Sequence, residues 1–346
     1  MKKIFKKKTS QSASSERITN NTVSEHRKKV LSGGRKFKYP LQYAKHRLVI
    51  MTIIISTLAL GVTILAGWWQ LYPQQNTSEF AYRTVRILPV PVASVDGSLV
   101  RYSDYLMIYR SSEHYLRNKE QVNLDTDDGK RQLSFYKQKS MKSVISDEFA
   151  RKKAVEYNLS VSDEEIKDKV NRLRQSDNFS VVAYDSVIKD YYGWSPDEYY
   201  HVVGAKLLKQ KVMYRMDEAA KKTARDIQTE LASDTKKTMQ AEFTDRQKSN
   251  PSIMYGSSGL VPKTNQDGGL AAKAATLQKG QLSDVITSDN GDGYYIIRLL
   301  DSNDSQVSYE FIQVRLTAFQ DALIALQKNN KVQVYINVPV DFTKED

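Results

Sequence analysis

The stretch from Leu48 to Trp69 reads LVIMTIIISTLALGVTILAGWW and contains no charged residue. An α-helix rises about 1.5 Å per residue, so a helix of this length covers the roughly 30 Å hydrocarbon core of a bilayer. Arg47 borders the stretch on one side, and the first charge on the other side is Glu79. The run is longer than the apolar region of a typical signal peptide. The sequence therefore predicts an uncleaved transmembrane helix over residues 48–70.

The charge of the chain is confined to one side of this stretch. The whole sequence has a formal net charge of +12. Residues 1–47 hold 14 of the 52 Lys and Arg residues but only two of the 40 Asp and Glu residues, so the rest of the chain is neutral overall. Cytoplasmic flanks of membrane helices carry an excess of Lys and Arg. We therefore expect a single-pass protein of the cell membrane, with a cytoplasmic N-terminus and an extracytoplasmic C-terminal body.

The basic segment 1–47 is expected to be a disordered arm, because so polar a chain buries too little apolar surface to offset its ordering entropy. Its charge predicts attraction to anionic membrane lipid, with nucleic acid as the alternative ligand of the arm. The neutral body gives no long-range attraction for a strongly charged partner. We therefore expect the body to bind no nucleic acid.

The sequence offers few residues for metal or nucleophile chemistry. It contains no cysteine and four histidines, and the last histidine is His201. The acidic cluster Asp125–Asp128 lacks the glutamate that a calcium loop needs at its twelfth position, where Tyr136 stands. We expect neither a metal site nor a cofactor.

Turn and capping signals divide the body into helices and a few strands. Asp96-Gly97 lies between β-prone residues and predicts a hairpin, since glycine tolerates a positive φ. Gly193 ends an apolar helical stripe, and Ser195-Pro196 begins the next helix. Residues 293–300 and 332–338 predict strands, and residues 311–326 predict a helix. The expected fold class is α+β, with a single transmembrane helix, a mostly helical region and a small α+β domain.

Several segments follow one another in an order that indicates a family. In the first part of the body they are VDGSLVRYSDY, NLSVSDEEIKDKV and GWSPDEYYHVVGAKLLKQKV, and in the second part LQKGQLSDVI and GDGYYIIRLLD. Together they resemble the SurA/PrsA-like family of extracytoplasmic foldases over roughly residues 90–340. The resemblance implies a helical SurA-like chaperone region beside a parvulin-type peptidyl-prolyl isomerase domain.

This resemblance and the charge pattern together predict six segments. They are a basic arm (1–47), a transmembrane helix (48–70), a tether (71–90), a helical chaperone region (91–216), a divergent parvulin-like domain (217–302) and a C-terminal helix and strand that pack on the chaperone region (303–346).

The parvulin-like part departs from the family pattern at its catalytic positions. The resemblance implies a His on the first strand, a second His on the late strand, and a prolyl pocket of Met and Phe. Here Tyr295 stands at the late-strand position, and the first strand falls near Val212–Met216, which contains no His. The pocket positions fall on Gln266 and Leu270. We therefore expect a degenerate pocket at Gln266, Leu270 and Tyr295, with no catalytic residue.

Many of the 21 tyrosines lie in the helical region. They could pack in a core, or they could form a peptide-binding cradle, because tyrosine combines apolar area with a polar tip. The candidates for such a cradle are Tyr102, Tyr105, Tyr109 and Tyr199.

The expected function is that of a membrane-anchored chaperone or foldase that binds unfolded or newly exported polypeptides. Two alternatives stay open: an active parvulin-type peptidyl-prolyl cis-trans isomerase with an altered site, and a non-enzymatic scaffold of the cell envelope. Turnover of a proline-containing peptide would favour the first alternative, and one dominant crosslinked partner would favour the second.

Overall fold

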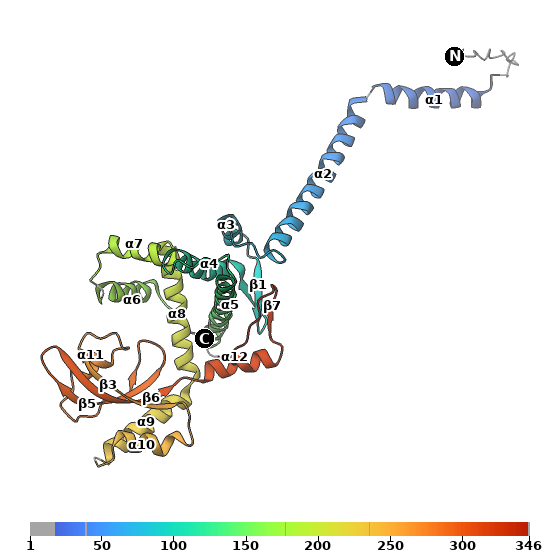
Figure 1. Cartoon of the computed structure of the whole chain (residues 1–346). Helices are drawn as coiled ribbons and strands as arrows, with labels where there is room; N and C mark the ends of the chain where they lie inside the picture. Colours follow the sequence, from blue (N-terminus) through green and yellow to red (C-terminus); the bar gives the residue numbers. More distant parts are fainter. Residues whose placement is uncertain (1–17, 39, 177, 235, 345–346) are drawn as a thin grey trace. The chain divides into compact units, whose positions relative to one another are not determined.

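The computed structural model describes residues 18–38, 40–176, 178–234 and 236–344, and it divides into two compact units, Met1–Trp69 and Gln70–Asp346. The described part of the first unit consists of helix α1 (Asn20–Lys38) and most of helix α2 (Pro40–Leu71) (Figure 1). Within the described residues, one helical stretch is long and apolar enough to cross a membrane, and it spans His46–Leu71. A candidate membrane helix is therefore present at the expected place.

The expected disorder of the arm is wrong for residues 20–38, which form α1. Every described side chain of this helix, from Asn20 to Gly33, is exposed. The helix is therefore held by its own backbone hydrogen bonds and by good helix formers such as Lys, Arg and Leu. The expectation of disorder considered only the apolar surface that the segment can bury, whereas a local helix can form without burying any. Residues 1–17 lie outside the described residues.

The second unit begins with helices around a small hairpin (Figure 1). Asp96 and Gly97 have φ values of 46° and 85°, as a tight hairpin turn requires. Gly193 has a φ of 68° at the end of α7, and Ser195 and Glu198 exchange both hydrogen bonds of a capping box at the start of α8. The elements are α3 (Glu79–Ile87), β1 (Pro91–Val95), β2 (Ser98–Arg101), α4 (Tyr102–Asn118), α5 (Asp127–Glu156), α6 (Asp163–Ser176), α7 (Val181–Tyr192) and α8 (Pro196–Met216).

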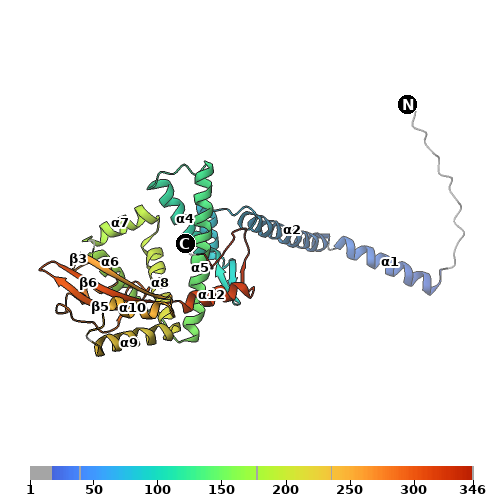
Figure 2. The ribbon, with the colours of Figure 1, turned by 60° about the horizontal axis from the view of Figure 1, so that its bottom comes forward.

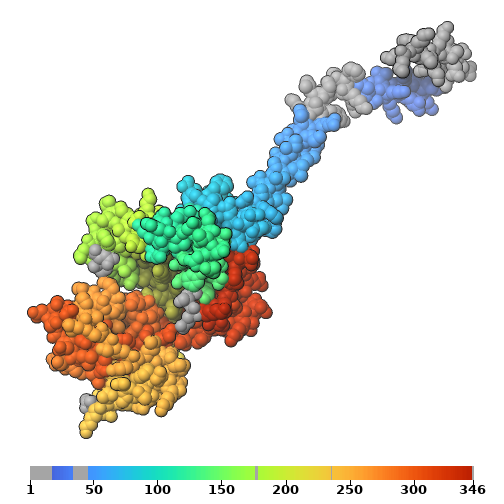
Figure 3. Space-filling model, viewed as in Figure 1, coloured from blue at the N-terminus to red at the C-terminus, as the bar shows by residue number. Residues whose placement is uncertain are grey.

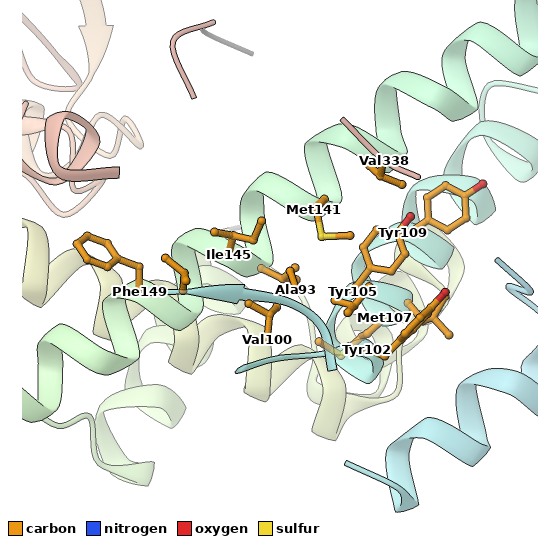
Figure 4. Close-up of a cluster of buried hydrophobic side chains, with 14 of the residues drawn as sticks. Ala93, Val100, Tyr102, Tyr105, Met107, Tyr109, Met141, Ile145, Phe149 and Val338 are labelled. Atoms are coloured by element: carbon orange, nitrogen blue, oxygen red, sulfur yellow. The ribbon is translucent and has the colours of Figure 1, made fainter. Parts of the chain in front are cut away.

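These helices and the hairpin surround an apolar core that the C-terminal segment completes. Strand β7 (Val332–Val334) pairs antiparallel with β1 and gives a three-stranded sheet in the order β2-β1-β7. Helix α12 (Ala318–Lys328) adds Phe319 and Leu323 to the core, and the ring centroids of Phe319 and Phe149 lie 5.1 Å apart. Figure 4 shows the core between α4, α5 and the hairpin, and Figure 3 shows the C-terminal segment (red) against the helices (green). We call this body, residues 70–216 with 318–344, the helical region.

The chain between α8 and α12 forms a second core, which we call the sheet domain (residues 217–317). Its antiparallel sheet has the strand order β3-β6-β5-β4. Alternate residues of β5 face opposite sides: Ile296 packs with α9 and Ile297 packs with α11. Figure 2 shows α9 beside the sheet. The elements are α9 (Glu218–Ser233), α10 (Met239–Gln247), β3 (Ile253–Pro262), α11 (Leu270–Ala274), β4 (Ile286–Thr287), β5 (Gly293–Ser302) and β6 (Gln306–Arg315). The second unit therefore confirms the expected α+β class.

The sheet domain continues beyond the boundary expected at residue 302. Strand β6 spans Gln306–Arg315 and pairs with both β3 and β5. The helix expected over residues 311–326 is wrong for residues 311–315, and α12 begins only at Ala318. The physical reason is that Phe311, Ile312 and Val314 pack on the two covered faces of this inner strand, and apolar residues at such spacing resemble a helix face in sequence.

The segment expected as a tether, residues 71–90, is folded onto the helical region. The hydroxyl group of Tyr102 donates a hydrogen bond to the Leu71 carbonyl at 2.7 Å, and that of Tyr72 donates to the Pro91 carbonyl at 2.6 Å. The short helix α3 also contributes to the buried interior, because it is amphipathic. Its buried residues are Ala81, Tyr82 and Val85.

Asp217 joins the two places where the chain passes between the helical region and the sheet domain. Its side chain is buried. One carboxylate oxygen accepts from the Ala220 amide at 2.9 Å, at the start of α9. The other accepts from the amides of Thr317 and Ala318 at 2.8 and 3.1 Å, at the start of α12. One carboxylate therefore caps two helices that are a hundred residues apart in sequence.

Asp96 fastens the hairpin to two distant segments and predicts an acid-sensitive contribution to stability. Its carboxylate accepts from Nζ of Lys152 at 2.6 Å and from Nζ of Lys331 at 3.1 Å. These hydrogen bonds lower the pKa of the Asp96 carboxyl below its ordinary value. The contribution is complete above that ordinary pKa and is lost as the pH falls through the lowered one. Asp96→Asn should therefore lower the unfolding midpoint at neutral pH and leave it nearly unchanged at low pH, as thermal unfolding at a series of pH values would measure.

The control for this prediction is Asp226→Asn, because Asp226 is an exposed aspartate of α9. Asparagine suits the positive φ at position 96, so the substitution adds no backbone strain. An equal midpoint loss at low and neutral pH would contradict the role of the two lysines.

Candidate functional site

Three of the four tyrosines considered for peptide binding lie in the core. Tyr102, Tyr105 and Tyr109 are 0%, 1% and 3% exposed, and they are labelled in Figure 4. Burial raises the pKa of all three phenols above the ordinary tyrosine value. Their spacing places them on one face of α4, and that face packs on α5 and the hairpin. All three side chains thus pack in the core in this structure, and a client-binding role for them stays an untested prediction.

The fourth candidate, Tyr199 on α8, belongs to a half-buried aromatic cluster. Its hydroxyl group lies 2.8 Å from that of Tyr184. The rings of Tyr192 and Trp194 stack with centroids 4.8 Å apart, and both ring centroids lie 6.5 Å from that of Tyr199. The Trp194 indole N–H donates to the Met107 carbonyl at 3.1 Å, which fixes the ring against α4. Tyr199 therefore acts as a support for Trp194.

Trp194 forms part of the wall of an open cleft between α3, α7 and the start of α8. The cleft has a volume of about 870 Å³, within the range that ligand sites in proteins occupy. We call it the α3–α7 cleft. Its apolar wall includes Ile87 of α3, Val182 of α7, Trp194 and Pro196. In Figure 1, α3 and α7 lie on the same side of the helical region.

Charged groups also line the α3–α7 cleft. The Tyr82 hydroxyl group donates to a carboxylate oxygen of Glu198, and a guanidinium nitrogen of Arg86 lies 3.4 Å from the same oxygen. Burial, and secondly the contact with Glu198, raise the pKa of Tyr82. Arg83 and Glu79 pair at 2.8 Å on the rim. The cleft is thus amphipathic, with apolar area for side chains and paired charges that can bind backbone amides and carbonyls.

The three expected pocket residues of the sheet domain do not form one site. Leu270 of α11 and Tyr295 of β5 are both buried in the same apolar cluster. Gln266 is exposed and lies outside that cluster. The Tyr295 hydroxyl group donates to the Asp292 carboxylate at 2.8 Å, and the Tyr309 hydroxyl group donates to the Asp267 carboxylate at 2.6 Å. Side chains therefore fill the space beside the late strand.

The residues expected at the first parvulin strand, Val212–Met216, are the last turn of α8. Tyr214 in this turn donates to the carbonyls of Ser288 and Gly293 at 2.8 and 2.9 Å. Gln210, one turn earlier, donates to the Asp289 carbonyl at 2.9 Å. In the part of the chain that the structure describes, no strand before α9 joins this sheet. Instead, the end of α8 fixes the loop that leads into β5.

The described residues contain no group of three His, Cys, Asp or Glu side chains placed to hold a metal ion.

The helical region and the candidate membrane helix match a known family. Residues 42–213 match the family model for the SurA-like N-terminal domain. The protein belongs to the SurA-like family. A search of the curated proteins finds no match.

This SurA-like chain also has a weak match among solved structures. The match comes from work on the virulence factor PEB4 and the periplasmic protein Cj1289, described as two structurally related SurA-like chaperones in Campylobacter jejuni. It has 12% sequence identity and a TM-score of 0.27, and it covers 70% of this chain and 91% of that chain. At this TM-score the likeness adds nothing to the family assignment.

Sequence reasoning missed the residues that line the α3–α7 cleft of this SurA-like protein. Trp194 lies in the short loop after Gly193, which ends α7. A periodic pattern of apolar residues identifies buried positions within helices and gives no information about a residue in such a loop. Ile87 and Val182 belong to short helices whose apolar residues are divided between a buried and an exposed face. Each of these helices has more apolar residues than one buried face accommodates, and counting them could have indicated that Ile87 and Val182 are exposed.

Proposed function

We propose that this SurA-like protein is a membrane-anchored extracytoplasmic chaperone, which binds unfolded or newly exported polypeptides in the α3–α7 cleft. The observation that carries the proposal is an open cleft of about 870 Å³ with an apolar wall and a charged rim. An unfolded chain offers apolar side chains together with unpaired backbone groups, and this lining suits both. The binding needs no covalent chemistry and no cofactor.

The anchoring part of the proposal is supported by the 26-residue apolar helix His46–Leu71 and by the basic segment that precedes it. An excess of Lys and Arg on one flank favours a cytoplasmic N-terminus. The helical region then lies outside the cytoplasm, where it meets exported chains. The basic segment would contact anionic lipid of the inner leaflet.

Val182→Asp should weaken client binding about tenfold or more, because an apolar side chain buried on binding contributes about 1.5–3 kcal/mol. Val182 lines the cleft and is 77% exposed, so its substitution should not affect folding. The matched control is Val155→Asp, since Val155 is 81% exposed on α5 and lies outside the cleft. The measurements are the affinity for a permanently unfolded polypeptide and the suppression of aggregation of a client without proline.

Equal effects of the two aspartate substitutions would contradict the cleft as the binding site. Photo-crosslinking from position 182 in cells separates the chaperone from the envelope scaffold. Many crosslinked clients are expected for a chaperone, and one dominant partner would favour the scaffold.

The sheet domain is proposed to be a degenerate parvulin-like domain that supports the fold or binds peptide. Isomerisation of a prolyl bond must overcome a barrier of about 18–20 kcal/mol, which requires a pocket around the ring. The packing of Leu270 and Tyr295 in one cluster, and the use of the Tyr295 hydroxyl group by Asp292, support the absence of such a pocket.

The full chain should therefore not accelerate cis-trans isomerisation of a prolyl tetrapeptide above the uncatalysed rate. The assay is run beside the aggregation assay on the same preparation, so that an inactive sample is recognised. Robust turnover that Gln266→Ala reduces, without loss of folding, would favour the active isomerase instead. Gln266 is exposed, so this variant tests the site without disturbing the core.

A further inference from the structure

Residues 71 and 72, where α2 ends, are held by the helical region. Leu71 and Tyr72 pack against the core of the helical region. The Leu71 carbonyl accepts from the Tyr102 hydroxyl group at 2.7 Å, and the backbone N–H of Asn76 donates to the Gln70 carbonyl at 2.9 Å. The chain that follows the candidate membrane helix is therefore part of the folded second unit from residue 70 onward.

Helix length fixes the level of the bilayer along α2. The uncharged stretch Leu48–Trp69 is about as long as the roughly 30 Å hydrocarbon core. Trp68 and Trp69 then lie at the interface, which aromatic rings favour. Gln70 and Leu71 follow directly and reach the headgroup layer.

Helix α3 begins only eight residues after Leu71 and presents an apolar face to the outside. At 100° per residue, its buried side is centred on Ala81 and Val85. Phe80 and Ile87 project from the other side and are 80% and 83% exposed, and Leu88, which follows the last helical residue, is 52% exposed. We call these three residues the α3 stripe. Ile87 also lines the edge of the α3–α7 cleft, whereas Phe80 and Leu88 lie outside it, so the stripe extends beyond the cleft.

The α3 stripe is held rigidly. Ser78 caps the helix by accepting from the Ala81 amide at 3.3 Å. Arg110 of α4 binds the Glu79 carboxylate and the Thr77 carbonyl, each at 2.5 Å. A large apolar surface that is fixed and exposed marks an interaction site rather than a fluctuating loop.

We propose that the α3 stripe rests in the headgroup region of the outer leaflet and so orients the helical region on the membrane. The proposal rests on the anchoring part of the proposed function. The bilayer is the favoured occupant because the same core holds the end of α2 and the buried side of α3, a few residues apart in sequence. An amphipathic helix with Phe, Ile and Leu outward and Arg83 beside them suits the boundary between headgroups and acyl chains.

The test uses the full chain in vesicles of phosphatidylcholine and phosphatidylglycerol. The sequence has no cysteine, so a single engineered cysteine carries the only label. Thr84 is half-buried one turn after Phe80, and Thr84→Cys keeps the stripe intact. An environment-sensitive fluorophore there should be quenched several-fold more by spin labels on lipid headgroups than the same fluorophore at Val155→Cys. Adding Phe80→Ser and Ile87→Ser to the Thr84→Cys protein should remove this difference.

The outcomes separate the two proposals. Equal quenching at both positions, in protein that stays in the vesicles after an alkaline wash, overturns the stripe proposal and leaves the anchoring intact. Release of the protein by that wash overturns the anchoring and the stripe proposal together. Loss of quenching when an unfolded polypeptide is added assigns the stripe to client binding and overturns the lipid contact.

Discussion

Replacing Phe149 with alanine is expected to lower the free energy of unfolding of the helical region by about 3–5 kcal/mol. The ring is almost fully buried on α5 and lies 5.1 Å from the ring of Phe319, measured between centroids. Phe319 belongs to α12, which follows the sheet domain in sequence and returns the chain to this core. The substitution therefore removes apolar contacts and also weakens the attachment of the C-terminal segment.

The matched control is Phe135→Ala on the same helix, because Phe135 is 47% exposed. Chemical unfolding followed by circular dichroism gives both free energies. Limited proteolysis after Lys328 or Lys331 reports separately on the C-terminal segment. Equal losses in the two variants would show that the ring pair of Phe149 and Phe319 is not part of the core.

Replacing Asp217 with alanine is expected to destabilise the joint between the two cores by about 3 kcal/mol, because an N-cap contributes roughly 0.5–2 kcal/mol and an unsatisfied buried donor costs about 1–3 kcal/mol. The carboxylate accepts three backbone hydrogen bonds, one from Ala220 and two from Thr317 and Ala318. Its negative charge also lies at the N-terminal ends of α9 and α12, where the helix dipole favours it. Alanine leaves all three amides without this acceptor.

Asp217→Asn should cost much less than Asp217→Ala, because the amide oxygen can still accept hydrogen bonds. Asp226→Ala, in an exposed position on the same helix, should change stability little. Hydrogen exchange of the Ala220, Thr317 and Ala318 amides gives the local measurement, and all three should exchange faster in Asp217→Ala. Unchanged exchange at Thr317 and Ala318 would contradict the proposed link between the two helices.

Local signals in the sequence were sufficient for the elements that depend on neighbouring residues. The apolar run, the Asp96-Gly97 turn and the Ser195 cap each act within a few residues, and each has the expected structure. The α+β class follows from the same signals. The matched family model over residues 42–213 agrees with the resemblance seen in the first part of the body.

The sites were harder to predict because exposure depends on contacts between distant segments. Tyr102 and Tyr199 both lie in the first turn of a helix, yet one is fully buried and the other is half-buried beside a cleft. The difference arises because α4 is covered by α5 and the hairpin, whereas the start of α8 faces α3 and α7 across open space. No periodicity within α4 or α8 contains that information.

The sequence by itself determined the candidate membrane helix, the charge asymmetry, the helix and turn boundaries marked by caps, and the family. These features follow from composition and from interactions over a few residues. The tertiary structure alone decided that residues 71–90 fold onto the core and that β6 is an inner strand. It also decided which aromatic residues form the α3–α7 cleft. These outcomes depend on which apolar faces meet, and segments as far apart as Asp217 and Thr317 meet only after the chain has folded.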